Sequence, residues 1–283
     1  MKSARIQPSA PQNRSGHATL DIGMVFGEST VTSAFATSPM KLLTPRARGQ
    51  SVLAYTSSFG GGLVAGDQTR LDVKLGAGAR CFIGTQSSTK VYRNPNQLPC
   101  GHITRAVLAS DSLLVFAPEP VQAFAGSVYS QQQEFHLAAG AGLVLLDWFC
   151  SGRSARGERW EFSQFQSRND VFIEGERAFV DSVLMDPADG SLTSPHRTGR
   201  FNCIAMLLLV GPPVQEAARG LLEEMASMPV ERDASLVCSA GPAAGGALLR
   251  IAAEQVEAVT QELYSRLKFL ALPLGEDPWL RKW

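Results

Sequence analysis

The first two hundred residues contain short segments in which hydrophobic and polar positions alternate. Residues 70–75, Arg-Leu-Asp-Val-Lys-Leu, show this period of two most clearly and predict a half-buried strand. Residues 53–59 and 143–146 are more continuously apolar and predict buried strands. Turns rich in glycine, alanine and serine separate such segments. The pattern predicts a mainly β body.

One strand–turn–strand pattern occurs three times. Leu75, Leu108 and Leu137 each precede a turn of small residues and a more apolar strand, and they lie 33 and 29 residues apart. This pattern is typical of a β-hairpin, and a period near 30 predicts stacked hairpins in a superhelical or solenoid-like body. A weaker fourth turn occurs at residues 173–176. Because glycine and alanine are common in any turn, coincidental similarity is the alternative.

Helical periods first appear after about residue 200. The predicted elements are, in order, a buried strand at 201–210 ended by Gly211-Pro212-Pro213, a helix at 214–228, a Gly/Ala/Pro loop at 239–246, a strand at 248–252 and a helix at 254–270. Each helix has one apolar face, which we expect to pack on the core. The predicted fold class is therefore mainly β, superhelical or solenoid-like stacked β-hairpins, with two α-helices in the C-terminal third.

The chain has 283 residues and is 45% hydrophobic, enough to bury a large core. Residues 1–16 are polar, lack the apolar core of a signal peptide and predict a disordered tail. We expect a single domain over residues 17–283, with a β body at 17–200 and strands plus two helices at 201–283.

Charge and cysteine content narrow the classes of partner and compartment. Lys plus Arg equals Asp plus Glu at 26 each, so the chain lacks the basic excess typical of nonspecific nucleic-acid binding. The longest apolar runs fall short of the roughly 20 residues needed to span a bilayer. Five cysteines without a C-x-x-C pair favour reduced thiols. We expect a cytoplasmic protein with no nucleic-acid or membrane partner.

The glycine-rich segment at residues 60–66 resembles a nucleotide-binding loop only superficially. Gly60, Gly62 and Ala65 satisfy the G-x-G-x-x-G/A spacing, but a strand follows where that motif requires a helix. The dipeptide Gly-Lys of a P-loop does not occur, nor does G-x-S-x-G of an acyl-transfer nucleophile. These enzyme classes are disfavoured.

Metal-ligand spacing is equally weak. The chain has four histidines, His17, His102, His136 and His196, which are scattered without ligand spacing. Cys100-Gly101-His102 offers two ligands, whereas a closed zinc or nickel site needs about four. If the protein handles a metal, we expect weak, exchangeable carboxylate and hydroxyl contacts.

Charged residues follow the buried strand that ends near Asp147. The loop behind it supplies Arg153, Arg156, Glu158, Arg159 and Glu161. Asp147 and Glu158 fit the paired carboxylates of a glycoside hydrolase. The alternative is a structural network of ion pairs with the adjacent arginines.

Four motifs in one order closely resemble the urease accessory protein family called UreD or UreH. They are GGLVAGDQTRLDV, TQSSTKVYR, FAPEPVQAFAG and LLDWFCSGRSARGERW. The resemblance is strong over residues 17–200, whereas the last third matches mainly in its two helices and its end at residues 279–283. It implies a mostly β, superhelical fold with two helices, and a chaperone rather than an enzyme.

The resemblance also implies partners and cargo. The partners are the urease apoprotein, a UreF-like accessory protein and a UreG-like GTPase, which would carry the P-loop that this chain lacks. The implied role is to help install nickel beside a carbamylated lysine of urease. No cofactor is expected to bind tightly, and nickel would be present only in transit.

The family resemblance further implies an internal, water-filled channel for nickel. Motif position and side-chain chemistry give the candidate channel residues Asp67, Thr85, Ser88, Lys90, Asp147, Glu158, Glu174, Glu176 and Asp181. A buried carboxylate without a partner is costly, so such a row implies either water or ion pairs. Ion pairs with the adjacent arginines are the alternative for Asp147 and Glu158.

The C-terminal end supplies candidates for partner binding. Trp279, Leu280 and Trp283 are expected to dock the UreF-like protein, because exposed aromatic and aliphatic side chains often mark interfaces. Closure of the β body is the alternative. The leading hypothesis is a urease maturation chaperone. Two others stay open: a β-solenoid carbohydrate-active hydrolase using Asp147 and Glu158, and a β-rich interaction module unrelated to urease.

Overall fold

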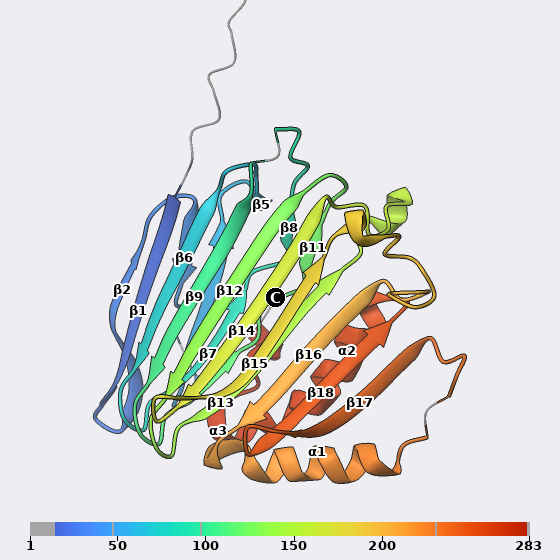
Figure 1. The fold of residues 1–283 in the computed structure, drawn as a ribbon. Coiled ribbons are helices and arrows are strands. Elements are labelled where there is room, and N and C mark those ends of the chain that lie inside the picture. The colour runs from blue at the N-terminus through green and yellow to red at the C-terminus, as the bar shows by residue number, and fades with distance from the viewer. Residues whose placement is uncertain (1–14, 47, 97, 230, 282–283) are drawn as a thin grey trace, which may run out of the picture.

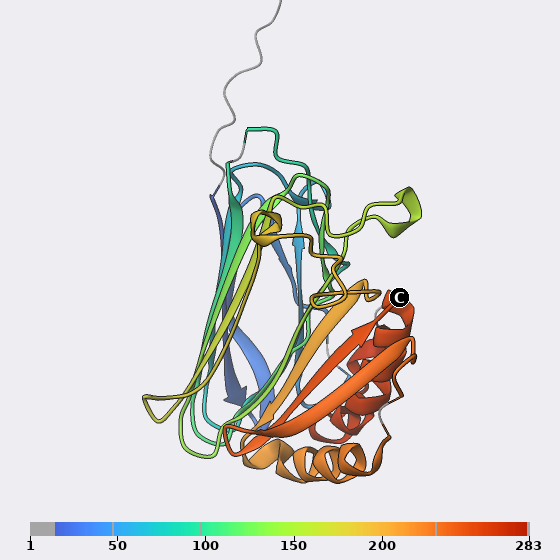
Figure 2. The ribbon, with the colours of Figure 1, turned by 45° about the vertical axis from the view of Figure 1, so that its right-hand side comes forward.

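Two β-sheets face each other in the computed structural model, which describes residues 15–281 except 47, 97 and 230 (Figures 1 and 2). The seven-stranded sheet has the order β15 (Glu176–Met185), β14 (Gln164–Ile173), β12 (Val128–Leu137), β9 (Cys100–Leu108), β6 (Gln68–Leu75), β1 (Ser15–Val25), β2 (Glu28–Ala36). The main path of the eleven-stranded sheet is β17 (Leu236–Ala243), β18 (Gly246–Ala253), β16 (Cys203–Val210), β13 (Gly142–Cys150), β10 (Leu113–Phe116), β7 (Arg80–Thr85), β4 (Val52–Ser58), β3 (Met40–Leu43). Its short additional strands are β5 (Gly62–Leu63), β8 (Thr89–Val91) and β11 (Val121–Ala123).

Successive repeats stack in register, which confirms the solenoid-like prediction. Leu75 lies opposite Leu108, and Leu108 lies opposite Leu137, in parallel strand pairs of the seven-stranded sheet. Three residues after each leucine, the backbone turns through a positive φ, at Gly78 (71°), Asp111 (57°) and Gly140 (76°). The turns also bond to one another, because Gly78 N donates to Ser110 O at 2.9 Å. The 33- and 29-residue spacings therefore mark structurally equivalent turns.

The prediction that these three turns close hairpins is wrong. Each turn joins a strand of the seven-stranded sheet to a strand of the eleven-stranded sheet, as β6 is joined to β7. The two strands face each other across a shared apolar core, and their backbone bonds go to neighbouring repeats. Alternating apolar positions look the same in a hairpin and in such an arch. The fourth turn, at residues 173–176, does close an antiparallel hairpin between β14 and β15.

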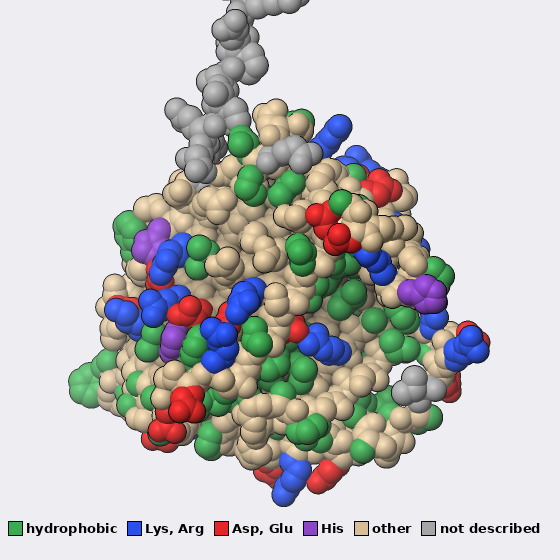
Figure 3. Space-filling view, in the orientation of Figure 1, with side chains coloured by type: hydrophobic (Ala, Val, Ile, Leu, Met, Phe, Trp, Pro, Cys, Tyr) green, Lys and Arg blue, Asp and Glu red, His purple; other side chains and the backbone are tan. Residues whose placement is uncertain are grey.

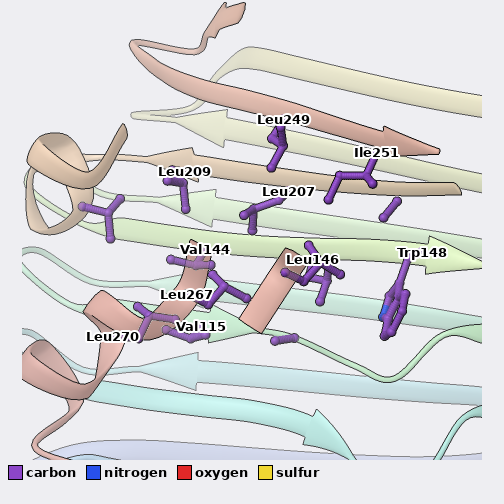
Figure 4. Close-up of a cluster of buried hydrophobic side chains, with 14 of the residues drawn as sticks. Val115, Val144, Leu146, Trp148, Leu207, Leu209, Leu249, Ile251, Leu267 and Leu270 are labelled. Carbon is purple, nitrogen blue, oxygen red and sulfur yellow. The ribbon is translucent and has the colours of Figure 1, made fainter. Parts of the chain in front are cut away.

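The two predicted helices are present and cover the outer face of the eleven-stranded sheet. They are α1 (Gln215–Ser227) and α2 (Val256–Leu267), followed by the short α3 (Ala271–Leu274). Leu221 of α1 and Leu263 of α2 belong to a buried cluster with residues of β13, β16 and β18. Figure 4 shows Leu267 beside Val144 in this cluster. The expected core packing of both helices is confirmed. Among the described residues, no helix is long and apolar enough to cross a bilayer.

Two segments differ from their sequence predictions. Residues 239–246 were expected to form a loop, but most of them belong to β17 and the start of β18. Pro242 is tolerated there because β17 is an edge strand, and Ala244 and Gly245 form the turn with φ of 51° and 74°. Ser15 and Gly16, assigned to the tail, begin β1. The rest of the predicted tail, residues 1–14, lies outside the described residues.

Candidate functional site

A layer of polar side chains crosses the inner face of the seven-stranded sheet. Its members occupy inward positions that are apolar elsewhere on the same strands, and they are Thr69, His102, Thr104, Gln131, Gln133, Ser167, Asn169 and Asp181. Strand register places them in rows: His102 lies opposite Gln131, which lies opposite Ser167. We call this set the polar layer. It separates an apolar cluster containing Leu71 and Phe135 from an aromatic cluster containing Tyr129 and Phe165.

The polar layer borders a cavity between the two sheets with a volume of about 90 Å³. The seven-stranded sheet contributes Thr69, His102, Gln131 and Gln133 to the lining, and β13 of the other sheet contributes Asp147. A second group of lining residues carries hydroxyls and comes from β4, β7, β8 and the segment between the last two: Ser57, Ser58, Thr85, Ser87, Ser88 and Thr89. Apolar side chains, among them Phe116, Val121 and Trp148, complete the lining, and a cavity of this size has room for several water molecules beside the polar groups.

Asp147 lies on β13, faces the polar layer and is 7% exposed. Its Oδ1 accepts a hydrogen bond from Gln131 Nε2 at 3.0 Å. Its Oδ2 accepts from Ser167 Oγ at 2.6 Å and from Asn169 Nδ2 at 2.8 Å. All three donors are neutral. The ion pairs found among the described residues do not include Asp147, so the alternative of a salt bridge to the nearby arginines does not hold for it.

The electrostatic environment of Asp147 disfavours its charge. Burial raises the pKa of this carboxyl above its ordinary value, and the hydrogen bonds from Ser167, Asn169 and Gln131 oppose that shift. The negative charge of Asp181 raises the pKa further. A buried carboxylate with only neutral donors gains stability from a cation that reaches it.

His102 also lines the cavity and is titratable, although the histidines show no ligand spacing in the sequence. Its Nδ1 lies 2.8 Å from Thr69 Oγ1, and its Nε2 lies 3.0 Å from Thr104 Oγ1. Burial lowers the pKa of the imidazole to about 4, so the ring is neutral at neutral pH. The signal available in the sequence was its inward position on an alternating strand between Cys100 and Thr104.

Three of the predicted channel residues meet at the cavity, namely Thr85, Ser88 and Asp147. Thr85 Oγ1 accepts from Glu119 N at 2.8 Å, which fixes the hydroxyl at the lining. Asp67 is buried in the segment before β6, where its carboxylate accepts from Val64 N at 3.0 Å. Lys90 lies on β8 next to the lining residue Thr89.

The other four predicted channel residues lie in different surroundings. Glu158 is paired with Arg153 and accepts from Ala125 N at 3.3 Å, as the ion-pair alternative expected. Glu174 and Glu176 are exposed at the turn between β14 and β15. Asp181 belongs to the polar layer and pairs with Arg250 of β18, with Nη2 and Oδ1 2.5 Å apart.

Asp147 and Glu158 do not converge on one site. Asp147 lines the cavity, whereas Glu158 is not among its lining residues and is held by Arg153 in a loop. A glycoside hydrolase requires both carboxyl groups to flank the scissile bond. The geometry gives no support to the hydrolase alternative.

The structure gives the predicted docking residues at the C-terminus different environments. Trp279 packs edge-on against Phe82, with ring centroids 5.5 Å apart, and also contacts Tyr264. Leu280 is 81% exposed. Trp283 lies outside the described residues. Trp279 therefore takes part in closing the β body, and Leu280 remains available at the surface.

Strong metal ligands do not cluster. Within the part of the chain that is described, no group of three or more His, Cys, Asp or Glu side chains is placed to hold a metal ion. His17 and His136 lie on the outer face of the seven-stranded sheet, where they pair with Asp72 and Glu134. Figure 3 shows acidic, basic and histidine side chains gathered on that face. Any metal contact in the cavity is thus limited to a few weak ligands.

Taken together, the fold and the cavity define a two-sheet, solenoid-like β protein with a cavity between the sheets that is lined by hydroxyls and by the carboxylates of Asp147 and Glu119. The UreD urease accessory protein family matches residues 14–283, and the chain belongs to this family. A urease accessory protein UreD of Sorangium cellulosum is 44% identical, over 95% of this chain and 85% of the relative. One of Anaeromyxobacter is 40% identical, over 95% and 90%. Urease accessory protein D of Arabidopsis thaliana is 33% identical, over 90% and 96%.

Proposed function

We propose that this chain is a non-catalytic chaperone of urease maturation, acting in the cytoplasm, and that its interior cavity conducts nickel. In this role it binds apo-urease together with a UreF-like protein and a UreG-like GTPase. The observation that carries the conduit is Asp147: a buried carboxylate that faces a cavity and receives only neutral hydrogen bonds. The membership of the family supports the role in urease maturation.

The cavity has the chemistry of a passage rather than of a storage site. A divalent cation entering it compensates the charge of Asp147. Hydroxyls such as those of Thr85 and Ser88, with any water present, replace part of the hydration shell of the ion. Because few strong ligands converge, the ion is held weakly and leaves quickly.

The polar layer supplies a direction for such a passage. From the cavity the layer continues through Ser167 and Asn169 to Asp181, at the edge of the seven-stranded sheet. Apolar side chains flank this polar row on both sides. A cation in transit is expected to follow the row, since leaving it means entering an apolar core.

The decisive experiment replaces Asp147 by asparagine, which keeps the size of the side chain and removes its charge. Purified apo-urease is activated with nickel, bicarbonate, the accessory partners and either wild-type chain or D147N. We expect at least about a tenfold loss of activated urease, the lower range for altered metal environments. The control is D72N, a carboxylate on the outer face of the same molecule.

Two further measurements separate the proposal from its alternatives. Circular dichroism must show that D147N is folded, and affinity purification must show that it still retains the urease partners. If folded D147N activates urease as well as wild type does, the conduit is excluded. Failure of the wild-type chain to copurify with urease or accessory proteins contradicts the chaperone role, and polysaccharide hydrolysis by the purified chain would establish the hydrolase instead.

A further inference from the structure

The tautomer of His102 is assigned from the direction of the Thr69 hydroxyl. Thr69 Oγ1 lies 3.1 Å from Gly101 O and 2.8 Å from His102 Nδ1, and with its single hydrogen directed at Gly101 O it accepts from Nδ1–H of His102. Nε2 of the same ring therefore carries the lone pair, and it accepts from the hydroxyl of Thr104. An imidazole that keeps this lone pair is neutral. A neutral imidazole nitrogen is a metal ligand that needs no loss of a proton.

Cys100, two residues earlier on the same face of β9, is not an equivalent ligand. Its Sγ donates to Val128 O at 3.3 Å. Cys100 is not among the residues that line the cavity. Among the described residues, His102 is the one imidazole in the cavity lining, and the thioether of Met40 is the sulfur side chain there.

His102 and Asp147 both line the cavity. Gln131 is the register partner of His102 on the adjacent strand, and its Nε2 donates to Asp147. The lining thereby combines one imidazole, the two carboxylates of Asp147 and Glu119, and several neutral oxygens. Imidazole favours nickel, copper and zinc, whereas an all-oxygen set favours magnesium and calcium.

We propose that His102 is a transient nitrogen ligand for the divalent cation in the cavity, and that it selects Ni²⁺ over Mg²⁺. This inference rests on the proposed passage of nickel through the cavity. The hydroxyl of Thr104 covers the Nε2 lone pair, and the cation must displace it in order to bind. Thr104 therefore weakens the site and keeps the ion exchangeable.

The chain has four histidines, which allows the ligand to be identified directly. A variant carrying H17Q, H136Q and H196Q keeps His102 as its only imidazole. The full-length chain is loaded with Ni²⁺ alone, and nickel K-edge X-ray absorption is recorded. We expect the multiple scattering of one imidazole in the nickel shell. A shell of oxygen ligands only overturns the proposal.

Two substitutions in this single-histidine background shift the affinity in opposite directions. H102N removes the lone pair, and we expect it to weaken Ni²⁺ binding by about tenfold while Mg²⁺ binding stays unchanged. T104V keeps the shape of Thr104 and uncovers Nε2, so we expect Ni²⁺ binding to tighten by about two- to tenfold, the worth of one hydrogen bond. Isothermal titration with each metal measures both.

The outcomes separate this inference from the proposed function. If H102N does not fold, T104V still decides, since unchanged Ni²⁺ affinity in T104V contradicts a covered lone pair. If the nickel shell contains only oxygen ligands and urease activation still depends on Asp147, the role of His102 is refuted but the conduit is not. Imidazole scattering combined with full activation by D147N refutes the conduit and leaves His102 as a ligand without a passage.

Discussion

At the residue scale, the neutral state of His102 in the polar layer makes the stability of the folded chain depend on pH under acidic conditions. The pKa of this imidazole falls from an ordinary value of 6.5 to about 4 in the folded chain. Between these values the unfolded chain binds a proton that the folded chain does not. Stability is therefore complete above pH 6.5 and is lost as the pH falls toward 4.

We expect H102N to flatten this dependence. Wild type loses up to about 3 kcal/mol through His102 between pH 6.5 and 4, from about 1.4 kcal/mol for each pKa unit. Urea unfolding at a series of pH values measures the slope for wild type, H102N and the control H196N, an exposed histidine of a loop. Parallel slopes in wild type and H102N contradict the prediction.

Individual residues of the candidate site could be predicted from the sequence only where the signal lay within a single segment of the chain. Asp147 could be found because an acid stands alone in an apolar strand, and Thr85 and Ser88 because they lie in one polar run. His102 was missed because its neighbours Thr69 and Gln131 come from other strands. Only the parallel register brings them together.

At the element scale, replacing glycine by alanine is expected to have opposite effects on stability at two positions. Gly246 begins β18, and a Cβ added there lies 1.9 Å from Leu209 O of the neighbouring strand. We expect G246A to destabilise the chain by about 3 kcal/mol or more, because backbone must move to relieve the clash. Gly220 lies within α1 with open space around it. G220A is the matched change and should stabilise by about 0.5–1 kcal/mol.

Thermal and urea unfolding of the two glycine variants compare these effects directly. Equal stability of G246A and wild type would show that β16 and β18 are less tightly paired than their register indicates. Destabilisation by G220A would argue against the exposed position of that residue in α1.

The positions of the strands and helices could be predicted better than the pairing of the strands. The apolar periods located β13, α1 and α2 to within a few residues. They did not reveal that each small-residue turn crosses between sheets, because strand pairing depends on contacts about 30 residues apart. The segment containing Pro242 looked like a loop because an edge strand tolerates residues that a central strand excludes.

At the scale of the whole molecule, the two sheets meet through apolar clusters on either side of the polar layer. Arg250 and Asp181 join the sheets at one end of this layer. The guanidinium is about half exposed, with 49% of the side chain accessible, while Asp181 has 11%. The positive charge of Arg250 is therefore in contact with solvent, whereas the negative charge of Asp181 lies inside the protein.

Removing Arg250 leaves Asp181 buried without its counter-charge and close enough to act on Asp147. We expect R250Q to cost about 1–3 kcal/mol of unfolding free energy, the range for hydrogen bonds to charged groups. The double variant D181N/R250Q should recover part of this loss, because the uncompensated charge is then absent. R105Q is the control: Arg105 is similarly exposed, at 51%, but pairs with Glu134 on the outer face, where an ion pair contributes under about 1 kcal/mol. Urea unfolding of wild type and the three variants measures how much this ion pair stabilises the contact between the sheets. Equal losses of unfolding free energy in R250Q and R105Q would mean that the pair of Arg250 and Asp181 behaves as an ordinary surface ion pair. The polar layer would then be open to water at its edge.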